Sequence, residues 1–243
     1  MTRLVTVMVK YLKSKLLGPI VWWLYEHFFI TYIVYLRVAC ARYALVSGGA
    51  NKKHDLEHEL IVSLTSYPPR FDKVHYTLLS LLAQSIKPDR VILWVAHGDF
   101  KYLSQKTLDL RRKGLDIRCC EDVESYKKII PCLVEFPHAC IVTADDDIVY
   151  KNNWLKSLVS CWDGASKTIV CHRANRIRFD ENHRPLSYKN WEINTDKVSA
   201  PYDLLPVGAG GVLYPPDSLD DQVTSERLFQ ELAPTSDDIW LYW

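Results

Sequence analysis

Short apolar runs alternate with amphipathic segments along the middle of this 243-residue chain, and this alternation limits the possible folds more than any other feature. Buried strands are predicted where the sequence has short β-branched runs: 60–66, 90–96, 115–119, 139–144 and 168–172. Helices are predicted where apolar residues recur at helical spacing: 71–85, 103–113, 126–136 and 153–161. Strands and helices that alternate at these lengths predict an α/β fold, a mainly parallel sheet with helices on both faces.

The ends of the predicted strands are the expected ligand-binding edge, because such sheets bind ligands beyond the carboxyl ends of their strands. Three segments follow strands in this way: Thr65–Arg70, His97–Asp99 and Asp145–Asp147. The three adjacent carboxylates of the last segment repel one another unless a cation or hydrogen-bond donors compensate them. Alternate residues of an extended segment point the same way, so Asp145 and Asp147 are predicted to share a Mg²⁺ or Mn²⁺ ion. An acidic turn that caps the following helix is the alternative.

Two later segments add candidate chemistry. The glycine-rich segment 207–212 is not GxGxxG, and Pro215-Pro216 follows it instead of a helix. It therefore predicts a turn or a backbone loop that approaches a ligand closely, not a dinucleotide site. Ser236–Trp240 offers two carboxylates beside an aromatic ring, which suits a general base. A helix N-cap at Ser236 or Asp237 is the alternative, and both can hold, because a helix start can present the second Asp to a cleft. In the donor-rich run 172–178, Arg176 and Arg178 are candidates for anion contacts, with a solvated ribbon as the alternative.

The N-terminal part differs from the rest in charge and hydropathy. Residues 1–53 hold eight Lys and Arg against one Glu, whereas residues 54–243 hold 22 against 28 acidic residues. Leu16–Leu36 is long enough to span a bilayer, but Glu26 lies in its middle and aromatic residues are frequent. We expect an interfacial or re-entrant helix at the cytoplasmic face of the cell membrane, with a true span or a helix pair packed on the body as alternatives. Nucleic acid is not expected as a partner, because the basic residues flank the apolar stretch.

The seven cysteines are odd in number and form no CxxC pair. This pattern predicts reduced structural thiols rather than a zinc site or a disulfide framework.

Four segments in order resemble glycosyltransferases of the GT-A fold: IVSLTSYPPRF (61–71), IVTADDDIVYKNNWL (141–155), PVGAGGVLYPP (206–216) and PTSDDIW (234–240). Bacterial glycosyltransferases of surface-polysaccharide assembly, of capsule and lipopolysaccharide, are the group that the chain resembles. The resemblance covers about residues 58–243. It implies a GT-A-like, Rossmann-like domain over 54–243 that follows a membrane-associating helical segment at 1–53. Such domains continue after the late acidic motif, so the resemblance also implies a C-terminal truncation.

The resemblance implies an inverting, metal-dependent transfer of a sugar from a nucleotide-sugar, such as a UDP-sugar, to a glycan or lipid-linked acceptor. It implies Mn²⁺ or Mg²⁺ on Asp145 and Asp147, and Asp237 or Asp238 as the base. The implied donor-site residues are Thr65, Ser66, Tyr67, Arg70, Lys128, Asp145 and Asp146, and those on the acceptor side are Gly210, Gly211 and Trp240.

Two other functions remain open at this point. One is a nucleotidyltransferase, although the prolines after the first strand do not suit the glycine-rich, basic phosphate loop expected there. The other is a catalytically inactive, membrane-docked partner subunit of a polysaccharide assembly complex.

Overall fold

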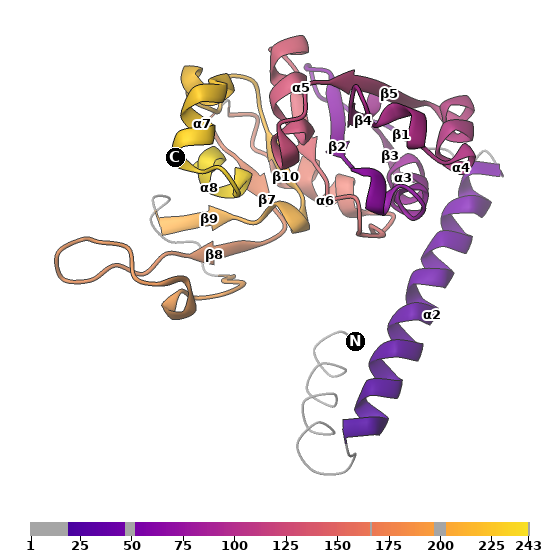
Figure 1. Cartoon of the computed structure of the whole chain (residues 1–243), viewed down its shortest axis with the longest axis horizontal. Helices are drawn as coiled ribbons and strands as arrows, with labels where there is room; N and C mark the ends of the chain where they lie inside the picture. The colour runs from indigo at the N-terminus through magenta and orange to yellow at the C-terminus, as the bar shows by residue number, and fades with distance from the viewer. Residues whose placement is uncertain (1–18, 47–51, 166, 197–202, 243) are drawn as a thin grey trace.

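A six-stranded sheet with helices on both faces forms the body of the molecule (Figure 1). The computed structural model describes residues 19–46, 52–165, 167–196 and 203–242, with side chains of the first helix described from Thr31 to Leu45. The sheet has the order β5-β4-β2-β6-β10-β7. Its strands, in that order, are Leu115–Cys120, Arg90–Ala96, Leu60–Thr65, Cys140–Thr143, Val212–Tyr214 and Val170–Cys171. The mixed α/β fold with a mostly parallel sheet is thus as predicted.

The four strands β5, β4, β2 and β6 run parallel to one another and match four of the predicted runs. Every side chain from Leu60 to Leu64 is buried. Strands covered by helices on both faces must be apolar on both sides, so their sequences are continuous apolar runs without alternation. The run at 168–172 forms only the two-residue edge strand β7, which pairs antiparallel with β10.

Two layers of helices cover the two faces of the sheet. The helices are α2 (Pro19–Val46), α3 (Val74–Leu82), α4 (Gln105–Leu108), α5 (Ile130–Glu135), α6 (Trp154–Cys161), α7 (Glu226–Leu232) and α8 (Asp237–Tyr242). Leu60, Val62 and Leu64 of β2 pack in one core cluster with α3 and α6, while Ile61 packs in another with Cys132 of α5. The alternation of side chains along a strand therefore divides the core between the two helical layers.

The predicted helices form with local differences. Of the segment 103–113, only α4 is α-helical, and a 3-10 helix continues to Lys113. It ends at Gly114, whose φ of 98° is in the left-handed region that glycine adopts without strain. Pro131 lies in the first turn of α5, where its missing N–H leaves no helical hydrogen bond unmade.

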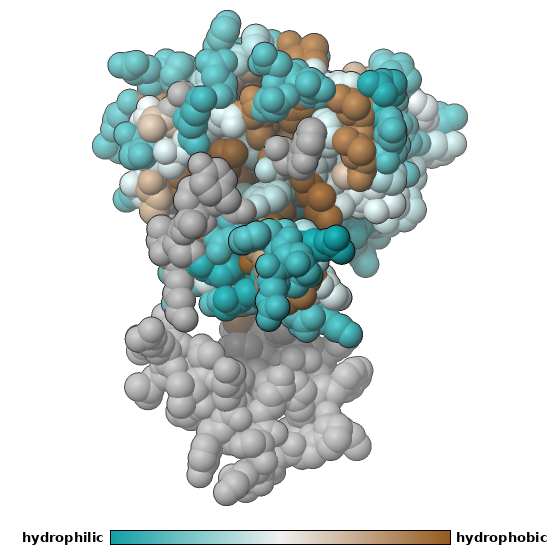
Figure 2. All heavy atoms as spheres, turned by 90° about the vertical axis from the view of Figure 1, so that its left-hand side faces the viewer, coloured by the Kyte–Doolittle hydropathy of each residue, from teal (hydrophilic) through white to brown (hydrophobic). Residues whose placement is uncertain are grey.

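The C-terminal half departs from the parallel pattern. Strand β10 comes from the end of the glycine-rich segment and pairs antiparallel with β6. Strands β8 (Ala174–Arg176) and β9 (Leu204–Pro206) form a separate antiparallel pair. Residues 177–196, which follow β8, extend from the body at the left of Figure 1, and hydrophilic residues dominate their surface in Figure 2. A second small sheet joins β1 (Lys52–Lys53) to β3 (Ile86–Lys87) in parallel.

Helix α2 contacts the body through its C-terminal part and extends away from it (Figure 1). Val38 and Ala41 are buried there, whereas Tyr35 and Tyr43 are exposed. No helix in the described part of the chain is long and apolar enough to cross a membrane. The four basic residues before position 19 lie outside the described residues, and the membrane contact stays a prediction. All seven cysteines are described and none forms a disulfide.

Candidate active site

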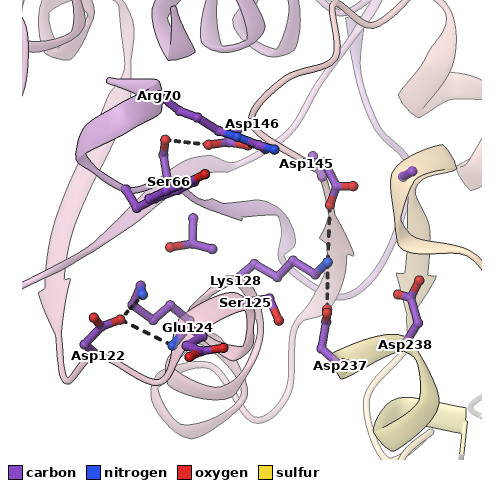
Figure 3. Close-up of a pocket in the computed structure, with 15 residues that line it drawn as sticks. Ser66, Arg70, Asp122, Glu124, Ser125, Lys128, Asp145, Asp146, Asp237 and Asp238 are labelled. Atoms are coloured by element: carbon purple, nitrogen blue, oxygen red, sulfur yellow. Dashed lines mark hydrogen bonds and ion pairs between the residues drawn. The ribbon is translucent and has the colours of Figure 1, made fainter. Parts of the chain in front are cut away.

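A cavity of about 600 Å³ opens at the carboxyl ends of β2 and β6 (Figure 3). After β2 the chain builds β4 and β5 on one side, and later returns to place β6 on the other side. A crevice forms at such a reversal of strand order, and ligands bind there in open α/β sheets. The lining comes from segments far apart in the sequence: Thr65, Ser66, Tyr67, Arg70, Asp122, Glu124, Ser125, Lys127, Lys128, Ala144, Asp145, Asp146, Ala209, Asp237 and Asp238.

Two of the three predicted strand-end segments meet in this cavity. The loop after β2 and the acidic segment after β6 both line it, because β2 and β6 are neighbours in the sheet. His97–Asp99 follows β4, on the other side of β2, and is not part of the lining. Being next to β2 is therefore not sufficient, since β4 is also its neighbour and the residues that follow β4 do not line the cavity.

The first group of side chains, the Arg70 cluster, consists of Ser66, Arg70 and Asp146, which line the cavity, and Asp147, which does not. Ser66 Oγ and Arg70 Nη1 each donate to the Asp146 carboxylate at 2.5 Å. Arg70 Nη1 also lies 3.2 Å from Asp147 Oδ2. The Asp146 side chain is buried, whereas Arg70 and Asp147 are 43% and 55% exposed. The cluster fastens the acidic segment to the loop after β2.

The second group, the Lys128 cluster, consists of Lys128, Asp145, Asp237 and Asp238. Lys128 Nζ lies 3.2 Å from Asp145 Oδ1 and 2.6 Å from Asp237 Oδ2 (Figure 3). Asp238 completes the cluster through the backbone N–H of Gly208, which donates to its two carboxylate oxygens at 3.1 and 3.0 Å. One ammonium thus joins the acidic segment after β6 to the late acidic motif at the start of α8.

The position of Lys128 is fixed by its backbone. It ends the 3-10 helix Glu124–Lys128, and its carbonyl accepts a 2.6 Å hydrogen bond from Ser63 Oγ of β2. Trp94 Nε1 of β4 donates in turn to Ser63 Oγ at 3.0 Å. Tyr126, two residues earlier, donates through its hydroxyl to Ala233 O at 2.6 Å. These bonds hold the lysine between the sheet and the C-terminal helices.

Burial and charge shift the protonation of this cluster. Burial by itself would lower the pKa of Lys128, but Asp237, Asp145 and Asp238 raise it on balance, so the ammonium stays charged. Burial raises the pKa of Asp238 above its usual range, the neighbouring Asp237 adds to that rise, and Lys128 opposes it. A carboxylate whose pKa is raised is a stronger proton acceptor than a solvated one.

A divalent cation is compatible with the charges of the cavity. Its lining has six carboxylates against three cationic side chains, so a diphosphate needs additional positive charge to bind. Among the described residues, no group of three His, Cys, Asp or Glu side chains could enclose a metal ion. Mg²⁺ requires no such enclosure, because it binds through one or two carboxylates together with substrate phosphates and water. Asp145, which lines the cavity, fits this role.

Asp147 does not lie as the sequence pattern predicts. Asp146 and Asp147 belong to a turn, so the alternation of an extended segment does not apply to them. Asp145 faces Lys128, and Asp147 faces Arg70. A metal shared by Asp145 and Asp147 stays a prediction, which requires Asp147 to leave Arg70.

The residues predicted on the acceptor side, Gly210, Gly211 and Trp240, make packing contacts and hydrogen bonds within the fold. Gly211 has a φ of 96°, and a Cβ there would lie 2.4 Å from the Trp154 ring. Gly210 accepts a 2.7 Å hydrogen bond from Trp154 Nε1 through its carbonyl. Trp240 is a correction: it is buried against Phe229 and its Nε1 donates to Val223 O, because α8 turns its apolar face to the core. Ala209 is the residue of this loop that lines the cavity.

Three charged side chains of the lining were not predicted from the sequence. Asp122, Glu124 and Lys127 come from the connection after β5, and Lys127 forms an ion pair with Asp122. No motif marks this connection in the sequence. The backbone offers one signal, since Glu124 has a φ of 53°, a strained value for a residue with a side chain.

Comparisons with known proteins do not identify the chain. No protein family model and no curated protein sequence matches it. Among solved structures, the inositol-1-phosphate CTP transferase from T. maritima is similar, at 12% sequence identity and a TM-score of 0.43, with 79% of each chain covered. Likeness at this level does not establish a common fold or activity.

Proposed function

We propose that the chain is a glycosyltransferase of the GT-A type, which moves a sugar from a nucleotide-sugar donor to a glycan or lipid-linked acceptor. One observation carries the proposal. The two acidic motifs, at Asp145 and at Asp237-Asp238, meet around Lys128 in a single cavity that the loop Thr65–Arg70 also lines. The resemblance of the same segments to surface-polysaccharide glycosyltransferases supports it.

The donor end of the cavity suits a nucleoside diphosphate. Thr65, Ser66 and Tyr67 line it beside the guanidinium of Arg70, which lies 5.5 Å from the centre of the Tyr67 ring. When the sugar leaves, the diphosphate gains negative charge, and fixed cations that face it lower the barrier. Arg70 and Lys128 are such cations, and Mn²⁺ or Mg²⁺ held by Asp145 would add positive charge at the leaving diphosphate.

The proposed base is Asp238, which takes the proton of the acceptor hydroxyl. The N–H of Gly208 orients its carboxylate, and its raised pKa favours proton uptake. Asp237 is the weaker candidate, because its carboxylate lies 2.6 Å from the Lys128 ammonium. An inverting transfer follows from this assignment, since a single base that acts on the acceptor suffices for direct displacement.

The acceptor is proposed to be a glycan or a lipid-linked intermediate at the cytoplasmic face of the cell membrane. The support is the sequence of the N-terminal segment, where basic residues flank an aromatic, apolar helix. The exposed tyrosines of α2 agree with an interfacial position.

The experiment is a panel of nucleotide-sugars, UDP-sugars first, incubated with the full chain and Mn²⁺ or Mg²⁺. We expect release of a nucleoside diphosphate in wild type and a loss of at least tenfold in Asp145→Asn. Asp99→Asn is the matched control, because Asp99 follows β4 at the same edge but does not line the cavity. Pyrophosphate release from a nucleoside triphosphate would instead indicate a nucleotidyltransferase, and no turnover with any donor would indicate a non-catalytic subunit.

A further inference from the structure

Arg173 is a half-buried cation without a counter-charge, next to the glycine-rich loop of the candidate site. Its Nε atom is buried and has no hydrogen-bond partner. Within the described part of the chain, no carboxylate forms an ion pair with its guanidinium. Burying the Nε–H donor of a charged guanidinium without a partner is costly, so a partner from outside the chain would stabilise this arrangement.

The other two arginines of the same run are already compensated. Arg176 Nη1 lies 3.1 Å from Asp203, and Arg178 Nη2 lies 2.9 Å from Glu192. These are the two arginines that the sequence offered as anion contacts, and the structure engages both in ion pairs within the β8–β9 region. Of the three, Arg173 is the one whose charge remains available.

Arg173 and Asp238 contact the same short loop, residues 207–210. Val207 N donates to Arg173 O at 2.9 Å, and a Cβ on Gly210 would lie 3.0 Å from the Arg173 Cβ. Between these two residues, Gly208 N donates to the Asp238 carboxylate. Glycine at position 210 permits this close approach, because any side chain there would meet Arg173.

Arg173 lies outside the donor cavity. The cavity lining includes Ala209 of the loop and Asp238, but not Arg173. An anion bound by Arg173 is therefore not the donor diphosphate between Arg70 and Lys128. It belongs to a molecule that approaches the loop from the side of β8, and this molecule is the acceptor if Asp238 is the base.

We propose that Arg173 binds an anionic group of the acceptor, an oxyanion such as a phosphate or a carboxylate. The inference rests on the proposed function in naming the acceptor, whereas the anion site itself follows from the geometry. A guanidinium presents parallel N–H donors that match two oxygens of such a group. The phosphate of a lipid-linked acceptor and the carboxylate of an acidic sugar offer the same chemistry.

The test is an NMR titration of the full chain labelled with ¹⁵N-arginine, in which the Arg173 Nε resonance is assigned with Arg173→Lys. Inorganic phosphate and acetate are added in separate arms, which distinguish the two sources of the oxyanion. We expect a shift of this resonance in at least one arm. Arg173→Gln, followed through neighbouring amide signals, should weaken binding about tenfold, as the loss of one charged hydrogen-bonding partner does. Arg184→Gln is the matched control, since Arg184 is exposed on the same β8–β9 segment.

The outcomes separate the anion site from the proposed function. Equal phosphate and acetate binding in wild type and Arg173→Gln would overturn the site. A UDP titration adds a second criterion, because loss of UDP affinity in Arg173→Gln would overturn the assignment to the acceptor. Thermal unfolding checks that each variant is folded. Absence of nucleotide-sugar turnover would count against the proposed glycosyltransferase alone, since the titrations require no turnover.

Discussion

The Arg70 cluster and the Lys128 cluster lie at the same edge of the sheet, and in each of them one cationic side chain interacts with several carboxylates. They differ in burial and in the segments that they join. Arg70 is 43% exposed and holds the loop after β2 to the turn after β6. Lys128 is 9% exposed and holds that same turn to α8, which comes from the far end of the chain.

The difference in burial predicts a different role for each cluster. Opposite charges attract more strongly where water is excluded, and a buried charge that loses its partner cannot be rehydrated. The exposed Arg70 cluster is therefore expected to have a small effect, on the position of the loop after β2 relative to the acidic segment after β6. The buried Lys128 cluster is expected to determine whether the two acidic motifs, at Asp145 and at Asp237-Asp238, come together in the folded protein. Matched substitutions in the two clusters test this expectation.

The largest effect is expected for Asp238→Asn. If Asp238 is the base, the variant should lower the turnover number by about a thousandfold, with little change in the KM of the donor. Asp237→Asn, next to it, should lose less, because Asp237 neutralises Lys128 and does not take the proton. Steady-state kinetics of transfer measure both. A larger loss in Asp237→Asn than in Asp238→Asn would reverse the assignment of the base.

The next effect is on stability, and Lys128→Met should show it. Three carboxylates would lose their shared ammonium, and breaking a buried pair in this way costs about 3–5 kcal/mol. The same change at the exposed Arg70 should cost less, about 1–2 kcal/mol, because Ser66 still donates to the buried Asp146 carboxylate. Urea denaturation at pH 7 measures both variants, and equal losses would show that burial does not distinguish the clusters.

The deficit of Lys128→Met should also depend on pH. Without the ammonium, burial and the neighbouring Asp237 raise the pKa of Asp238 further above its value in the unfolded chain, because Lys128 no longer opposes them. The folded state then binds protons more tightly, so the deficit should shrink as the pH falls toward 5. A deficit that stays constant between pH 7 and pH 5 would contradict this electrostatic origin.

The two clusters also mark how far the sequence alone could predict the site. Thr65–Arg70 and Asp145–Asp147 each adjoin an apolar strand, and local pattern was enough to identify both. The parallel strands were predictable for the same reason, since burial on both faces gives continuous apolar runs. The role of Lys128 as the link between two acidic motifs was not predictable. It depends on α8 packing beside the 3-10 helix that ends at Lys128, more than a hundred residues earlier in the chain.

Trp240 and Arg176 show the converse case, in which the sequence suggested a ligand contact and the structure shows a partner within the protein. Each looked like a ligand-binding residue, because an aromatic ring beside two carboxylates and an arginine at a strand end both suit a sugar or an anion. The structure gives Trp240 a partner in Val223 O and Arg176 a partner in Asp203. Neither partner adjoins its residue in the sequence, so pattern could not reveal that these groups were already engaged.

A smaller effect is expected for Gly208→Ala, which tests how tightly the Lys128 cluster is packed. A Cβ at this position would lie 2.6 Å from Asp238 Oδ1 and 3.1 Å from Lys128 Nζ. Displacing these atoms should cost about 1–3 kcal/mol in stability and lower turnover. Gly98→Ala is the control, because a Cβ there meets nothing within 4 Å. Thermal unfolding compares the two, and unchanged stability in Gly208→Ala would show that the cluster can relax.

The smallest effect on stability is expected for Asp147→Asn, in the exposed part of the Arg70 cluster. Its carboxylate is 55% exposed and 3.2 Å from Arg70, so the loss should be about 0.5 kcal/mol or less. Its effect on the Mn²⁺ concentration needed for half-maximal transfer is more informative. Because Asp145 lines the cavity and Asp147 faces Arg70, Asp145→Asn should raise that concentration more. A greater rise in Asp147→Asn would mean that Asp147 leaves Arg70 when the donor binds, and that the Arg70 cluster opens while the Lys128 cluster stays closed.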